Sequence, residues 1–137
     1  MKKVFIVVIY IVTASLLIEQ AADQNLISKA LTTVSKSAST KPTMPILANT
    51  LLSVQEGVLK LYSTDLEIGI KVTLNVEVTE KGEDITVNSK LLTEYINSLA
   101  ESEVKLVSEG TNLIVSNDSA KADFTTIKAK DFPKVPD

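Results

Sequence analysis

The sequence predicts an α+β domain built on an antiparallel sheet, and two observations support this fold class. Among the 137 residues, only two segments carry apolar residues at helical spacing, whereas the other apolar segments are short or alternate with polar residues. The connections are short, and neither helical segment is placed as the crossover of a repeated strand–helix–strand unit. We therefore expect a single domain with two helices on one side of the sheet.

The apolar start of the chain differs in composition from this domain. A basic start, Met1–Lys3, precedes a nearly continuous apolar run, Val4–Ile18. This order, with small residues near Ala14, is typical of a secretory signal, although a membrane span needs about 20 apolar residues. A signal or anchor, a buried strand and a spurious upstream extension all remain open. We expect an extension over residues 1–14 and a folded domain over residues 15–137.

The domain is predicted to begin with a short strand and a helix. Leu16–Gln20 has the pattern of a strand, and the carboxylate of Asp23 can cap a helix that starts at Gln24. The buried stripe of this helix consists of Leu26, Ile27, Ala30, Leu31 and Val34. The opposite side carries Lys29, Thr32, Thr33 and Lys36. One face of the helix is therefore apolar and the other is basic.

The segment KPTMPILAN, from Lys41 to Asn49, ends this helix. Pro42 and Pro45 have no backbone N–H, and each disfavours the α conformation in the residue before it. The helix must therefore stop near Thr40. A buried strand is predicted to begin at Ile46–Leu47.

Four strands are predicted between the two helices. Leu51–Val54 and Val58–Tyr62 flank a turn and form a hairpin. In the third strand, Leu66–Val78, every even position is apolar, which predicts one buried and one solvated face, and Asn75 marks a point where it can break. Ile85–Val87 is the fourth.

The second helix follows directly, and Ser89 is the residue expected to cap it. Its predicted buried stripe consists of Leu91, Leu92, Tyr95, Ile96 and Leu99. Three further strands are predicted at Glu103–Val107, Leu113–Val115 and Lys121–Ile127.

The composition argues against an enzyme. The chain has no histidine and no cysteine, which removes the usual general base near neutral pH, thiolate chemistry and the commonest metal ligands. It has no glycine-rich phosphate loop, and its four glycines are isolated. The acid pairs Glu83–Asp84 and Glu101 with Glu103 border strand ends, where solvated side chains are expected. We therefore predict no catalytic residue, metal, cofactor or small-molecule substrate.

Charge is segregated along the chain. The net charge is −3, and all fourteen basic residues are lysines. Residues 24–44 contain Lys29, Lys36 and Lys41 and no acidic residue, whereas residues 45–120 contain twelve acidic residues and five lysines. Lysines act as point charges, which suits contacts to phosphates better than base reading.

Four motifs carry a family resemblance. KPTMPILAN (residues 41–49), STDLEIGI (63–70), VNSKLL (87–92) and DFP (131–133) occur in the order and spacing of the first domain of the bacterial sliding clamp, which they closely resemble. This clamp is the β subunit of DNA polymerase III, and the resemblance extends from about Ser15 to Asp137. It implies the DNA-clamp fold, with antiparallel sheets on the outside and two helices on the inner face.

The resemblance also implies a function and a set of DNA contacts. The family forms a cytoplasmic ring, usually of two protomers with three similar domains each, around duplex DNA. Lys41 matches a basic residue that contacts DNA, and Lys29 matches one on the first inner helix. Lys90 matches one at the start of the second helix that is associated with DNA or with the subunit boundary. Helical spacing adds Lys36 to this group. Binding through these lysines would reach the phosphates without reading the sequence.

Further partners are implied by the same resemblance. The strand Lys121–Ile127 matches the edge that pairs with the third domain of the neighbouring protomer. Lys121, Ala122 and Phe124 are the predicted interface residues, with Ala122 where other clamps can place a bulky apolar residue. The family's pocket for peptides of the polymerase and the clamp loader lies mainly in the third domain, which nothing in this chain resembles.

The sequence thus predicts a non-enzymatic processivity module, the first domain of a ring that holds the replicative DNA polymerase on double-stranded DNA. It would act with the remaining clamp domains and a second protomer. The alternative is an exported or membrane-anchored α+β binding domain, which residues 1–14 and the acidic composition favour.

Overall fold

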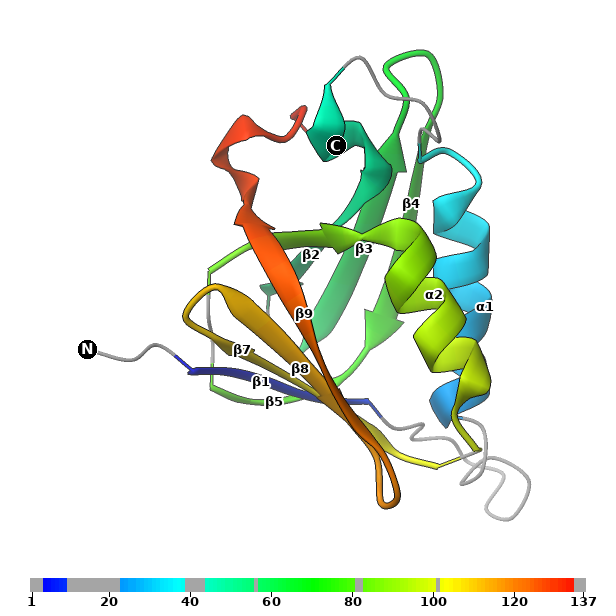
Figure 1. The fold of residues 1–137 in the computed structure, drawn as a ribbon, viewed down its shortest axis with the longest axis vertical. Coiled ribbons are helices and arrows are strands. Elements are labelled where there is room, and N and C mark those ends of the chain that lie inside the picture. The colour runs from blue at the N-terminus through cyan, green and yellow to red at the C-terminus, as the bar shows by residue number, and fades with distance from the viewer. Residues whose placement is uncertain are drawn as a thin grey trace.

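The fold is α+β, as predicted, and Figure 1 shows its two helices packed side by side. The computed structural model describes residues 4–9, 23–38, 44–55, 57–80, 83–100 and 102–134. The helices are α1 (Asp23–Ser35) and α2 (Ser89–Ser98), and two 3₁₀ turns are η1 (Pro45–Ala48) and η2 (Ala129–Asp131). The strands are β1 (Val4–Ile9), β2 (Asn49–Gln55), β3 (Val58–Thr64), β4 (Gly69–Asn75), β5 (Glu77–Glu80), β6 (Ile85–Asn88), β7 (Val104–Glu109), β8 (Asn112–Ser116) and β9 (Lys121–Lys128).

Within the described residues the strands form one antiparallel sheet in the order β4-β3-β2-β6-β9-β8-β7-β1-β5. Strand β9 joins its two halves. Thr126–Lys128 pairs with β6, whereas the residues from Lys121 to Thr125 pair with β8. The prediction of an antiparallel sheet with two helices is confirmed.

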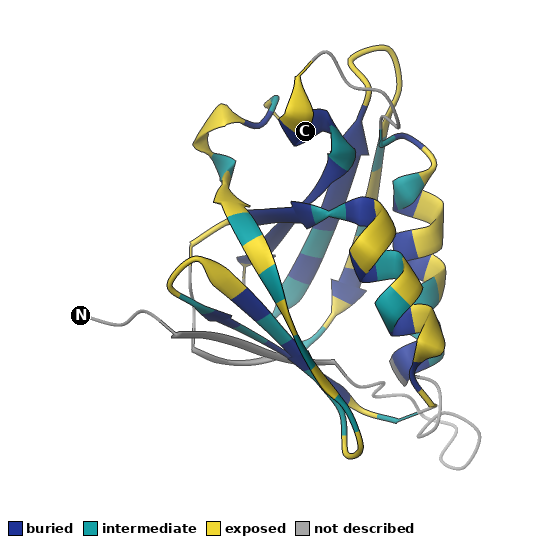
Figure 2. Cartoon of the chain, viewed as in Figure 1, coloured by how far each residue is buried: buried dark blue, intermediate teal, exposed yellow. Residues whose placement is uncertain are grey.

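The main core lies between the helices and one face of the sheet, which Figure 2 shows as the dark blue stripes of the helices and strands. Helix α1 contacts β3 and β4, and α2 contacts β2 and β6. The helices contribute Ile27, Ala30, Leu31, Val34, Leu92 and Ile96 to this core. Helical spacing therefore identified the buried side of α1 correctly.

A second, smaller cluster lies outside this core and joins motifs that are far apart in the sequence. Its buried members are Ile46 of η1, Leu51 of β2, Tyr62 of β3 and Phe132 after η2. The rings of Tyr62 and Phe132 meet edge to face, with centroids 5.9 Å apart. The KPTMPILAN and DFP motifs thus pack against each other.

The predicted strand start at Ile46 is wrong. Ile46 and Leu47 are buried, but they belong to η1, and β2 begins at Asn49. The fixed φ of Pro45 suits the first position of a helical turn, and the N–H of Leu47 donates to the carbonyl of Met44 at 3.0 Å.

The predicted strand Leu66–Val78 is two strands, β4 and β5, with the break at Val76, next to the expected Asn75. Its first residues form a tight turn in which Leu66 has φ 80°. The Asp65 carboxylate accepts from the N–H groups of Ile68 and Glu67 at 2.8 and 2.9 Å, and these bonds lower the pKa of Asp65. At the start of this segment, local hydrogen bonds therefore form a turn, although the alternating apolar pattern predicts a strand.

The start of the chain contributes a strand. Val4–Ile9 forms β1, which pairs with β7 and β5. Most of its residues are β-branched, which favours a strand, and they lie in the apolar run for which the sequence leaves a signal, an anchor, a buried strand and an extension open. The predicted strand Leu16–Gln20 lies outside the described residues.

We expect Gly69→Ala to lower the free energy of unfolding by about 1–3 kcal/mol because the site is already filled. A Cβ at Gly69 would lie 2.5 Å from Oη and 3.0 Å from Cζ of the buried Tyr62. Urea denaturation of Gly69→Ala in the wild-type and Tyr62→Phe backgrounds measures this effect. The destabilisation should be smaller in the Tyr62→Phe background, since the nearest atom is then gone, and an equal effect in both would contradict the steric explanation.

Candidate nucleic-acid interface

Helix α1 and the turn that follows it present two of the predicted lysines to solvent. Lys29 is exposed within the helix, and Lys36 is exposed in the turn that follows Ser35. They are seven positions apart in the sequence, which corresponds to about two helical turns, or about 10 Å along a helix. The described helix contains a single acidic residue, Asp23, at its first position. Beyond its first residue, α1 and the turn that follows it therefore carry positive charge, at Lys29 and Lys36, and no negative charge.

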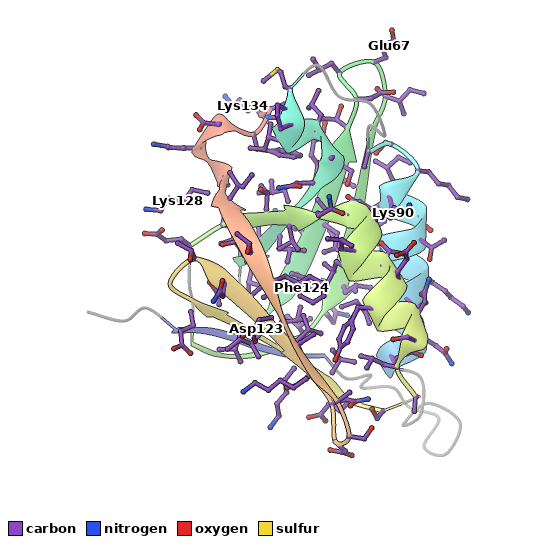
Figure 3. All side chains as sticks on the ribbon, viewed as in Figure 1. Glu67, Lys90, Asp123, Phe124, Lys128 and Lys134 are labelled. Carbon is purple, nitrogen blue, oxygen red and sulfur yellow. The ribbon has the colours of Figure 1, made fainter. Side chains whose placement is uncertain are left out.

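Helix α2 begins with the third lysine. Its N-cap is Asn88, whose side-chain oxygen accepts from the N–H of Leu91 at 3.0 Å, so the predicted cap at Ser89 is wrong by one residue. Lys90 is exposed at the second helical position, as Figure 3 shows. Leu91 was expected in the buried stripe, but it is 57% exposed because the core lies on the side of Leu92.

The two helices run antiparallel to each other. Gln24, at the start of α1, donates through Nε2 to the carbonyl of Ile96 near the end of α2 at 2.6 Å. The hydroxyl of Ser28 also hydrogen-bonds the side-chain oxygen of Asn97. The end of α1 consequently lies beside the start of α2, which brings Lys36 and Lys90 to the same end of the helix pair.

A pocket lies at this end of the helix pair. Its volume is about 580 Å³, and it is bounded by the end of α1, by η1 and by the first turns of α2. Ser35, Ala38, Ala48 and Lys90 are among its lining residues. Glu94, one turn after Lys90, also lines it and places a negative charge beside that lysine.

A buried chain of hydroxyl groups sets the position of the two helices at this end. The hydroxyl of Ser37, just after α1, lies 2.7 Å from the carbonyl oxygen of Ser63 on β3 and donates to it. The hydroxyls of Ser63 and Thr50 are 2.8 Å apart, and Thr50 also hydrogen-bonds the hydroxyl of Ser89 at the start of α2. Because all four residues are buried, each hydroxyl needs its partner.

The sequence alone did not predict this network, although three of its members, Thr50, Ser63 and Ser89, lie in or beside the family motifs. Ser63 opens STDLEIGI, Ser89 lies within VNSKLL, and Thr50 follows KPTMPILAN. Asn49 of the same motif donates through Nδ2 to the hydroxyl of Thr86 at 3.0 Å, and Thr86 donates to the carbonyl of Ile127. The signal for this network in the sequence was the presence of polar residues inside strands that are otherwise apolar.

Lys41 lies outside the described residues, so the structure places three of the four predicted lysines.

The described part of the chain has no group of three or more acidic side chains arranged to hold a metal ion. None of the described helices is long and apolar enough to cross a membrane.

The predicted interface strand is β9. Lys121 is exposed, whereas Ala122 and Phe124 are half-buried, and Phe124 packs against the core. The ring of Phe124 meets Tyr95 of α2 edge to face, with centroids 5.6 Å apart. Figure 3 shows Asp123 and Phe124 on β9. Phe124 therefore packs β9 against α2, and its side chain is only half-buried.

An antiparallel sheet with two helices and exposed lysines on one side is the arrangement expected of a domain of the DNA-clamp class. The sequence model of a family described as "DNA polymerase III beta subunit, N-terminal domain" matches residues 18–136. The chain belongs to this family, and the resemblance of its motifs is confirmed.

Curated relatives and solved structures agree with this assignment. The beta sliding clamp of Vibrio harveyi is 33% identical over 110 residues, which are 80% of this chain and 76% of that protein. The beta sliding clamp of Streptomyces coelicolor is 26% identical over 114 residues, which are 83% of this chain. The chain spans 30% of that relative's length. A DNA polymerase III beta subunit from Thermotoga maritima superimposes with a TM-score of 0.81 at 26% identity, covering 96% of this chain and 32% of that one.

Proposed function

We propose that this chain is the first domain of a ring-shaped sliding clamp that encircles duplex DNA and keeps the replicative DNA polymerase on its template. The observation that carries the proposal is a set of exposed lysines on the helix pair of a chain of the clamp family: Lys29 on α1, Lys36 in the turn after it, and Lys90 on α2. Lysines on helices that face a duplex attract its phosphates without regard to sequence.

The proposed action is topological and not catalytic. A closed ring holds its partner because the DNA cannot leave sideways, so neither base reading nor a reacting group is needed. Lys29, Lys36, Lys41 and Lys90 would contact the phosphate backbone, and cytoplasmic DNA is the expected target.

Closure of the ring is assigned to β9. Lys121, Ala122 and Phe124 would pair with a domain of a second protomer, with Phe124 as the apolar anchor. Polymerase and clamp loader would bind through the other domains of the clamp. The clamp of Helicobacter pylori, of similar fold, has been solved bound to a DNA ligase peptide, which supports partner binding by such rings.

The test uses this chain fused to the second and third domains of a related clamp. The fusion protein is loaded onto nicked circular DNA, and its retention is measured by gel filtration before and after the circle is cut. Retention should fall to background on linear DNA and should persist when the ends of the linear DNA are blocked by bound streptavidin. Release at the same rate from circular and linear DNA would exclude the encircling function.

A further inference from the structure

The two ends of the helix pair are held in different ways. At the end where α1 begins, Gln24 donates directly to the carbonyl of Ile96 on α2 at 2.6 Å. At the other end lie Lys36 and Lys90, and there no hydrogen bond among the described residues joins one helix to the other. The pocket of about 580 Å³ lies between the helices at this end. The relative position of the two lysines must therefore be set through the sheet below.

Each of these lysines is the sequence neighbour of a buried hydroxyl group. Lys36 directly precedes Ser37, and the N–H groups of both residues donate to carbonyls three positions earlier, so they belong to one hydrogen-bonded turn. Lys90 directly follows Ser89, and both lie in the first turn of α2. A constraint on either serine is therefore passed to the backbone of the adjacent lysine.

The two serines are connected through β3 and β2. The Ser37 hydroxyl lies 2.7 Å from the carbonyl oxygen of Ser63, and the Ser63 hydroxyl lies 2.8 Å from that of Thr50. The hydroxyl of Thr50 also hydrogen-bonds that of Ser89. Thr50 and Ser63 are 0% exposed, and Ser89 and Ser37 are 2% and 3% exposed. Thr50 thus joins the branch that reaches α1 to the branch that reaches α2.

We propose that Thr50 is a positioning residue for DNA binding, which sets the relative position of Lys36 and Lys90 through this chain of hydroxyls. The proposal rests on the proposed function. Thr50 is fully buried and touches no DNA itself. A buried network whose members are all paired fixes one arrangement. Lysines that are already placed lose less conformational freedom when they meet the phosphates.

The hydroxyl of Thr50 is not required for the strand or for the core. Its neighbours on β2 include Leu51, Leu52 and Val54, all buried. A valine at position 50 would share the β-branched shape and the strand preference of threonine. It would make neither hydrogen bond and would leave the hydroxyls of Ser63 and Ser89 without this partner. The hydroxyl therefore supplies connection between the helix ends.

A pair of spin labels tests the positioning directly and without DNA. The chain has no cysteine, so Lys36→Cys with Lys90→Cys takes labels at these two sites only. Electron paramagnetic resonance of the labelled 137-residue chain gives the distribution of distances between the labels. Thr50→Val should widen this distribution, and Thr50→Ser should keep the wild-type width. Ser89→Ala, which removes only the link to α2, should widen it as well, and circular dichroism verifies the fold of each variant.

Thr86→Val is the matched control. Thr86 is also 0% exposed, and its hydroxyl also makes two hydrogen bonds, one from the side chain of Asn49 and one to the carbonyl of Ile127. These bonds lead to β9 and not to the helices, so the control should leave the distribution unchanged. A Thr50→Val distribution as narrow as that of the wild type would overturn the proposal, as would equal widening in Thr86→Val.

Duplex binding by the fused ring separates positioning from a general loss of structure. Thr50→Val should lower the affinity about three- to tenfold, because the two lysines must then be ordered on binding. In a background that carries Lys36→Ala and Lys90→Ala, Thr50→Val should cause no further loss, since the lysines that it positions are gone. Thr50→Ser should bind like the wild type. An equal loss in both backgrounds would show a merely structural role and would overturn the proposal.

The two experiments distinguish this proposal from the proposed function. If the fused wild-type ring is not retained on circular DNA, the proposed function fails, and the spin-label distances still decide whether Thr50 sets the spacing. If the ring is retained and Thr50→Val binds DNA like the wild type, the positioning role fails and the proposed function stands.

Discussion

Phe132→Ala is expected to lower the free energy of unfolding by about 3–5 kcal/mol, a large part of the total stability of a domain of this size. Phe132 is 8% exposed and packs edge to face on Tyr62. Ile46 and Leu51 complete this cluster, which joins segments from distant parts of the chain. Removing the ring leaves a cavity that the short turns η1 and η2 can close only in part.

Urea denaturation followed by circular dichroism measures this destabilisation. Ile127→Ala, which truncates a side chain that is 44% exposed on β9, is the matched control and should change stability by less than about 1 kcal/mol. A Phe132→Ala variant as stable as the control would show that the second cluster does not hold the two motifs together.

Replacing Lys29 and Lys36 together by alanine in the fused ring is expected to reduce its affinity for duplex DNA and the salt dependence of that affinity. Removing one lysine–phosphate interaction lowers the slope of log K against log salt by about 0.9. Lys90→Ala should have a smaller effect, because Glu94 lies one helical turn away and offsets part of its charge.

Fluorescence anisotropy with a labelled duplex at several salt concentrations measures these slopes. The control replaces Lys60 and Lys105, which alternate with core residues of β3 and β7 and therefore face away from the helices. Its slope should match that of the wild type. Equal reductions in the two double variants would contradict a DNA-binding helix face.

Most elements could be predicted because their residues satisfy local rules. The apolar stripe of α1 and the strands after α2 required only periodicity. The wrong predictions of strand bounds lie where local hydrogen bonds or a proline compete with the apolar pattern. Pro45 starts a 3₁₀ turn where a strand was expected, and the Asp65 turn interrupts the alternation that begins at Leu66.

The candidate site was predictable to a lesser degree. The lysines stood out because no acidic residue accompanies them between Gln24 and Met44. The arrangement of the lysines in space could not be predicted, because the antiparallel packing of α1 on α2 depends on contacts such as that of Gln24 with Ile96. Those two residues are 72 positions apart in the chain.

The sequence by itself determined the fold class, the family and the absence of acidic residues around the lysines of the first helix. Periodicity, motif order and the count of charges can be read along the chain without knowing which residues meet in space. Tertiary structure alone decided that the motifs meet through the hydroxyls of Thr50, Ser63 and Ser89, and which strand edges are open. The physical reason is that strand pairing decides which residues are hydrogen-bond partners and which strands lie at the edge of the sheet. Pairing joins residues that are far apart in the sequence, and no local pattern indicates which residues will pair.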